Sequence, residues 1–134
     1  PDAAALARAV SLCEGSVARA VALLDPATAA VETEVSALLA GLPEPDGRRV
    51  LKLAETLAGR DAEPLLATVL DAIQRHVAAE IDRRQGEGPA RLLALVEAAE
   101  RIASSAREAA IYNLDRRPVV LAAFRELAAA TRIP

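Results

Sequence analysis

Aromatic and sulfur-containing residues are almost absent from this chain of 134 residues, which has one Phe, one Tyr, one Cys and neither Trp nor Met. A single cysteine, Cys13, excludes a disulfide within the chain, and together with one histidine it leaves too few ligands for a typical zinc site. No apolar run reaches the roughly 20 residues that span a bilayer. We therefore expect no metal or other cofactor, no membrane partner and a reducing, cytoplasmic environment.

An excess of positive charge is also missing. Sixteen Lys and Arg against nineteen Asp and Glu give a formal net charge of −3. Proteins that bind the DNA backbone or an anionic membrane usually carry the opposite balance. We expect no direct nucleic-acid partner.

What the chain does contain is Ala, Leu, Val and Ile, which supply nearly all of its 53% hydrophobic residues. This composition favours helix over sheet, and apolar residues recur at helical spacing in each segment between Gly and Pro residues. We predict an all-α fold, a helical bundle of about five main helices preceded by two short helices.

Gly, Pro and capping residues divide the chain into seven predicted helices. The short ones cover residues 3–12 and, after Ser16, about 17–24. The main helices follow Asp25, Asp46, Asp61, Gly88 and Asp115. The helix that begins at Pro89 is predicted to bury a stripe rich in alanine, made of Leu92, Val96, Ala99, Ala103, Ala106 and Ala110.

Residues with catalytic potential are isolated from one another. His76 lies at the edge of an apolar helix face, and Cys13, Ser104 and Ser105 have no neighbouring base or glycine elbow. A general base needs an orienting group and a nucleophile, and neither can be assembled here. We expect no enzymatic activity and no small-molecule substrate.

The segment from Asn113 to Pro118 is more informative. It places Arg116 and Arg117 in the first turn of the last predicted helix, where the helix dipole disfavours each cation by about 0.3–1 kcal/mol. Either the long side chains are simply solvated beside the capping Asp115, or they dock on carboxylates of a neighbouring helix or subunit. The spacing alone leaves both interpretations open.

Two stretches of the chain carry a resemblance to a known family. Residues 113–124, NLDRRPVVLAAF, resemble the "NLDRKQ…VL.AF" stretch that closes bacterial DNA polymerase III delta-prime subunits. Residues 14–24, EGSVARAVALL, are similar to the "GS..RAL.LL" helix in the lid domain of AAA+ clamp-loader subunits. The stretches stand in the expected order and bracket almost the whole chain.

The resemblance implies a piece of a longer protein: the tail of an AAA+ lid domain in residues 1–25, then a helical collar domain in residues 26–134. In that family the collar domains of delta-prime, delta and tau/gamma pack into a ring that holds the clamp loader together during DNA replication. Delta and tau/gamma would be the partners. The candidate interface residues are Asn113, Asp115, Arg116, Arg117 and Phe124.

The chain departs from the family pattern at two places. The sensor arginine of ATP-using relatives would fall on Ala18, and Arg19 is displaced by one residue, about 100° around a helix. This departure implies a subunit without ATPase activity. Arg117 and Pro118 also replace the more usual Lys and Gln, so contacts through that position are not carried over.

A structural role is the alternative. The small residues Ala99, Ala103, Ala106 and Ala110 could form a face through which a free-standing bundle associates with itself.

Overall fold

The computed structural model of the chain describes residues 2–12, 17–84 and 86–134. Over these residues the fold contains no strand, which confirms the predicted all-α class. Cys13, and Ser16 as the predicted cap of the second helix, lie outside the described residues. The helices are α1 (Ala3–Leu12), α2 (Val17–Ala22), α3 (Pro26–Ala40), α4 (Gly47–Leu57), α5 (Glu63–Arg83), α6 (Pro89–Ile111) and α7 (Arg117–Thr131).

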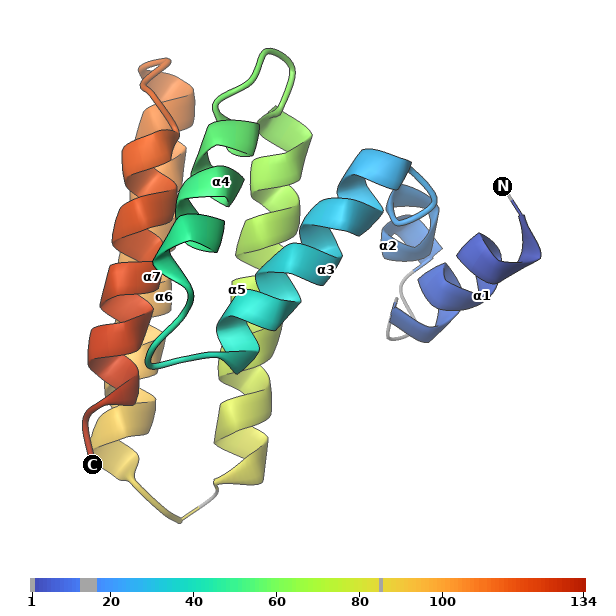
Figure 1. Cartoon of the computed structure of the whole chain (residues 1–134). Coiled ribbons are helices and arrows are strands. Elements are labelled where there is room, and N and C mark those ends of the chain that lie inside the picture. The colour runs from blue at the N-terminus through green and yellow to red at the C-terminus, as the bar shows by residue number, and fades with distance from the viewer. Residues whose placement is uncertain (1, 13–16, 85) are drawn as a thin grey trace.

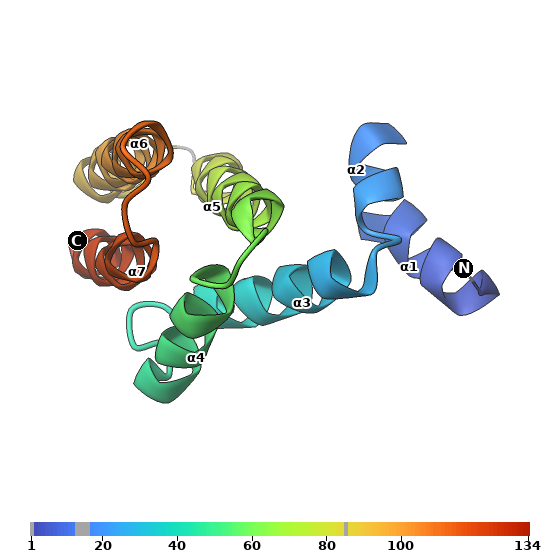
Figure 2. The ribbon, with the colours of Figure 1, turned by 90° about the horizontal axis from the view of Figure 1, so that it is seen from above.

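Helices α5, α6 and α7 stand side by side as the upright part of the bundle (Figure 1). Helix α6 packs against both α5 and α7, and α4 packs on α7. Helix α3 packs on α5 and α4 and slants away from the bundle, carrying α2 and α1 at its far end (Figure 2). None of the described helices is long and apolar enough to cross a membrane.

Two of the predicted N-caps are confirmed, and two are wrong. The N-cap position of α7 is Arg116 and not the predicted Asp115. Asp25 has extended backbone and accepts a hydrogen bond from the backbone N–H of Thr28, and Asp46 accepts from Arg48 N–H. Asp61 instead has a φ of +62°, and α5 begins two residues later at Glu63. Because an N-cap needs an extended backbone, a left-handed Asp61 forms the preceding turn and does not cap α5.

The core is formed by α3 to α7, the five main helices, and Phe124 is its largest fully buried side chain. The predicted stripe of α6 is only partly right. Ala99 and Ala106 are buried, but Leu92, Val96 and Ala103 are half-buried and Ala110 is exposed. Because α6 lies between α5 and α7, the face that it buries is rotated about the helix axis from the predicted face. The residues of the observed buried face are Leu95, Ala98, Ala99, Ile102, Ala106 and Ala109.

A buried carboxylate joins three of the helices. Glu32 of α3 is only 2% exposed. Its Oε1 lies 3.1 Å from Nη2 of Arg19 in α2, and both of its oxygens lie 2.9 Å from Nη2 of Arg75 in α5. Asp71 of α5 also pairs with both arginines, at 3.3 Å from Arg19 Nε and 3.1 Å from Arg75 Nε. We call Arg19, Glu32, Asp71 and Arg75 the Glu32 network.

The network offsets the cost of burying a charge. An isolated buried carboxylate is strongly disfavoured, but here two guanidinium groups neutralise Glu32 and the hydroxyl of Ser36 donates a further, longer hydrogen bond of 3.4 Å. Arg19 and Arg75 keep partial contact with water, with side chains 12% and 23% exposed. The network therefore attaches α2 to the bundle by directional contacts.

Replacing Glu32 by Ala should lower the free energy of unfolding by about 2–3 kcal/mol, because it removes the buried carboxylate that two partly buried arginines share. This is below the roughly 3–5 kcal/mol typical of a broken buried pair, since both arginines can still reach water. Urea denaturation followed by circular dichroism measures the loss.

Glu34 supplies the matched control. It lies on the same helix and holds Arg49 with two hydrogen bonds of 2.8 and 2.9 Å, but the pair is exposed. Glu34→Ala should therefore cost far less than Glu32→Ala. Equal losses in the two variants would contradict the role of the network.

Candidate protein-protein interface at the corner between helices 6 and 7

The end of α6 is fixed by the backbone of Asn113. Its φ is +51°, the left-handed conformation that ends many helices. The N–H of Leu114 then donates to the carbonyl of Ala109 at 2.9 Å, and the N–H of Tyr112 donates to Glu108. The bond from Leu114 to Ala109 is the 6→1 hydrogen bond of a Schellman motif, in which Asn sometimes replaces Gly at the left-handed position. Asn113 thus turns the chain sharply from α6 toward α7.

Arg116 is held inside this chain. Its side chain is 18% exposed, and Nη1 donates to the carbonyl oxygens of Leu57 at 3.0 Å and Gly59 at 3.3 Å. These carbonyls lie at the C-terminal end of α4, where the helix dipole favours a cation. Nη2 also pairs with Glu63 of α5 at 3.3 Å. Arg116 therefore connects the start of α7 to α4 and α5.

Arg117 forms ion pairs that are more exposed to water than those of Arg116. Its guanidinium donates to both carboxylate oxygens of Asp115 and reaches Glu55 of α4 at 3.5 Å. Asp115 also accepts from the backbone N–H of Arg117 at 3.0 Å, so it satisfies an amide at the start of α7. The side-chain hydrogen bond from Arg117 is the largest cause of a lowered pKa of Asp115, and the bond from the backbone N–H of Arg117 lowers it further. Within the described residues, each arginine pairs with a carboxylate of a neighbouring helix, which is one of the two interpretations that the spacing left open.

Phe124 does not belong to this surface. It lies on α7, is 2% exposed and packs in the bundle core. A partner cannot contact it while the bundle is intact, so the structure corrects its selection as an interface candidate. The apolar spacing of α7, which placed Phe124 on the same face as Val120 and Leu127, already indicated a core position.

Three large apolar side chains at the corner were missed from the sequence. Ile111, Tyr112 and Leu114 are 72%, 70% and 55% exposed. We call them the corner patch. Ile111 is the last residue of α6 and Tyr112 follows it, and neither belongs to the buried face of that helix. Leu114 follows Asn113 in the turn. Their position just beside a helix break was the signal that could have identified them.

An apolar groove runs from the corner patch between α5 and α6. It has a volume of about 290 Å³, and Leu114 lies at its edge. Leu66, Leu70, Ala106 and Ala110 form part of its apolar lining. Ala110 and Ala106 come from the predicted alanine stripe, but Ala106 is buried within the bundle, as is Ala99. The stripe is therefore not available as a whole to a second copy of the chain.

The corner combines exposed apolar side chains with arginines that are paired with carboxylates. No group of three or more His, Cys, Asp or Glu residues that could hold a metal ion occurs among the described residues. His76 lies on α5, away from the residues that line the corner groove. Exposed apolar side chains beside a groove, bordered by paired charges, are typical of a surface that binds protein.

Comparisons with known proteins identify no relative: no family model, no curated protein and no solved structure matches the chain.

Arg116→Ala should lower the free energy of unfolding by about 1–2 kcal/mol, because it leaves carbonyls at the end of α4 without a charged donor. Arg117→Ala should change it too little to resolve, since its ion pairs are exposed to water. Urea denaturation of both variants checks the order. A larger loss for Arg117→Ala would show that the contacts of Arg116 do not stabilise the fold.

Asn113 should tolerate Gly but not Val. Glycine adopts a positive φ without strain, whereas a β-branched residue in this conformation should cost about 1–2 kcal/mol. Thermal unfolding of Asn113→Gly and Asn113→Val measures the difference. Equal stability of the two would mean that the left-handed turn does not control the end of α6.

Proposed function

We propose that the chain is an oligomerisation module of the collar type, part of a bacterial clamp-loader delta-prime subunit that supports sliding-clamp loading in DNA replication. On this proposal its partners are the tau/gamma and delta subunits in the cytoplasm, and it has no ATPase activity of its own. The observation that carries the proposal is the stretch 113–124, which resembles the closing segment of that family.

The geometry supports a binding role for that stretch. The segment begins at the turn where Ile111, Tyr112 and Leu114 are exposed together. In protein interfaces a few large, well-packed side chains near the centre carry most of the binding energy, and exposed apolar side chains of this kind can take that role. A subunit that packs on the corner patch would cover the groove between α5 and α6 as well.

Arg116 and Arg117 would have a supporting role in such an interface. Arg116 already binds α4 and α5, and Arg117 binds Asp115 and Glu55. Arg116 therefore orients the turn that presents the corner patch. Because Arg117 is more exposed, it would be the arginine that a partner's carboxylate could reach.

The environment of Arg19 supports the absence of ATPase activity. In ATP-using relatives the sensor arginine would fall on Ala18, one residue earlier. Here the guanidinium of Arg19 lies against Glu32 and Asp71 of the bundle. An arginine engaged with two carboxylates of its own chain is poorly placed to stabilise a nucleotide phosphate.

Size-exclusion chromatography with light scattering, on the chain mixed with tau/gamma and delta, tests the proposal. We expect co-elution of the unmodified chain. The double variant Ile111→Ser/Leu114→Ser should weaken assembly by about tenfold or more, because hot-spot residues each contribute on the order of 1–2 kcal/mol.

The control is Leu51→Ser/Leu93→Ser, which removes two leucines that are 50% and 60% exposed on other surfaces, on α4 and α6. It should assemble like the unmodified chain. Co-elution that both double variants weaken equally would rule out the corner patch as the contact. Separation of the unmodified chain from both partners at low salt would contradict the collar proposal, and a dimer in that experiment would favour self-association.

A further inference from the structure

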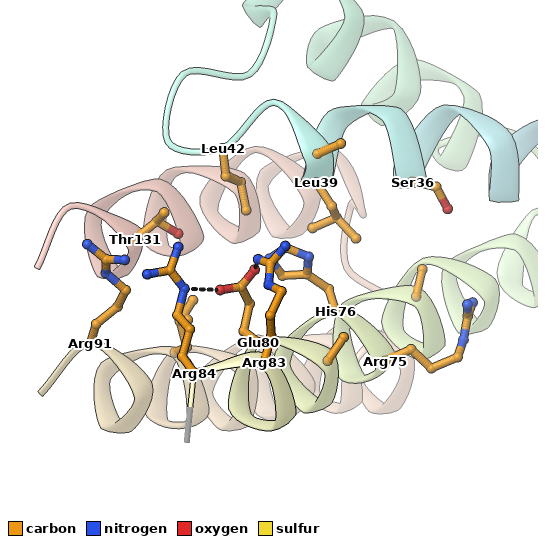
Figure 3. A pocket seen from close by; sticks show the side chains of 14 residues that line it. Ser36, Leu39, Leu42, Arg75, His76, Glu80, Arg83, Arg84, Arg91 and Thr131 are labelled. Atoms are coloured by element: carbon orange, nitrogen blue, oxygen red, sulfur yellow. Dashed lines mark hydrogen bonds and ion pairs between the residues drawn. The ribbon is translucent and has the colours of Figure 1, made fainter. Parts of the chain in front are cut away.

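A second cavity lies at the opposite end of α5 from the corner. It has a volume of about 540 Å³ and is bordered by α3, α5, α6 and the end of α7. Small-molecule sites usually occupy roughly 300–1,000 Å³, so this cavity has room for a ligand of that kind. We call it the arginine pocket, after Arg83, Arg84 and Arg91 (Figure 3).

Positive charge is concentrated in this pocket although the whole chain is acidic. Arg83, Arg84 and Arg91 line it, and the acidic residue among its lining is Glu80. Three positive charges against one negative charge leave an excess of two. Arg75 lines it as well, but its guanidinium is already bound by Glu32 and Asp71.

Glu80 positions two of the arginines. Its side chain is 13% exposed, its Oε2 lies 2.9 Å from Nε of Arg84, and its Oε1 pairs with Arg83. Arg91 is oriented from the other side, because its Nε donates to the carbonyl of Ile133 at 2.7 Å. Figure 3 shows Glu80 between Arg83 and Arg84, and the guanidinium of Arg91 beside that of Arg84.

These contacts leave hydrogen-bond donors available. Among the described residues, Arg91 and Arg84 use only their Nε groups in side-chain hydrogen bonds. Their terminal nitrogens can therefore donate to an anion, and neighbouring guanidinium groups match the oxygens of a phosphate group well.

The remaining wall of the pocket is apolar. Leu42 follows α3 and is half-buried, whereas Leu39 of α3 and Leu95 of α6 line the pocket from the buried core. Figure 3 shows Leu39 and Leu42 facing the arginines across the cavity. His76 lies between the two walls. Burial, and then the charge of Arg83, lower the pKa of His76, so its imidazole is neutral at pH 7 and adds no charge to the excess of two.

We propose that the arginine pocket binds a phosphate monoester with an apolar body, its dianionic head on Arg84 and Arg91 and its body against the apolar wall at Leu42. A dianion matches the excess of two positive charges, and the apolar wall distinguishes this ligand from inorganic phosphate. The inference goes beyond the collar function and does not depend on it.

The test is a titration of the ¹⁵N-labelled chain with phenyl phosphate in a chloride buffer of low ionic strength, followed by amide chemical shifts. We expect saturable shifts in residues 39–42, 76–84 and 91–95. Inorganic phosphate should bind at least about fivefold more weakly, because it cannot bury a ring against the apolar wall. Phenol, which lacks the charge, should cause no saturable shift.

Arg84→Gln/Arg91→Gln should weaken phenyl phosphate binding by about tenfold or more, since each charged hydrogen bond contributes on the order of 1.5–3 kcal/mol. The control Arg48→Gln/Arg125→Gln removes the same charge from exposed positions outside the pocket. With both variant pairs titrated in the same buffer at moderate salt, where distant charges are screened, the control should change affinity less than about twofold. Equal weakening by both pairs, no saturation by phenyl phosphate, or equal affinity for inorganic phosphate would each overturn the proposal. The comparison of ligands uses the unmodified chain and holds even if a variant folds poorly.

Discussion

The buried carboxylate of Glu32 is the constraint on which the arrangement of the helices depends. A charge that is 2% exposed must be neutralised where it lies, and here the neutralising groups come from α2 and α5, on either side of α3 in the chain. Apolar packing alone allows helices some freedom to slide and rotate, whereas two guanidinium groups on one carboxylate allow little. The network therefore fixes how α2, and α1 with it, lies against the bundle.

Arginines have two different uses in this fold. Arg19, Arg75 and Arg116 are partly buried and join helices that are distant in sequence. Arg84 and Arg91 have donors directed at a cavity. The first group makes the bundle specific, and the second creates a local positive potential in an acidic protein. The corner patch is different again, because its exposed side chains are apolar. The arginine pocket and the corner patch lie toward opposite ends of α5, so each can be tested without disturbing the other.

Much of the fold could be predicted because it depends on local signals. Helical spacing of apolar residues predicted the all-α class. Together with caps such as Asp25 and Asp46, it also predicted most of the helix boundaries. The buried face of α6 could not be read correctly, because Leu and Ala occupy so many of its positions that spacing selects no single face. Asp61 was misassigned because a capping residue and a left-handed turn residue share the same preference for Asp.

The Glu32 network needs contacts across 43 residues of sequence, which no local pattern reveals. At the corner, Arg116 and Arg117 stood out as unusual residues for the first turn of a helix, but the exposure of Ile111 and Tyr112 depends on how α6 packs.

Amide hydrogen exchange of the Glu32→Gln variant tests the central role of the network most directly. The Glu32→Gln change keeps the size of the side chain and removes its charge, so α2 should lose its main ionic attachment while α6 and α7 keep theirs. We predict faster exchange in Val17–Ala22, with no change in α6 and α7 and no change anywhere in a Glu34→Gln control. Exchange in α2 that is the same in the Glu32→Gln variant and the unmodified chain would contradict the account.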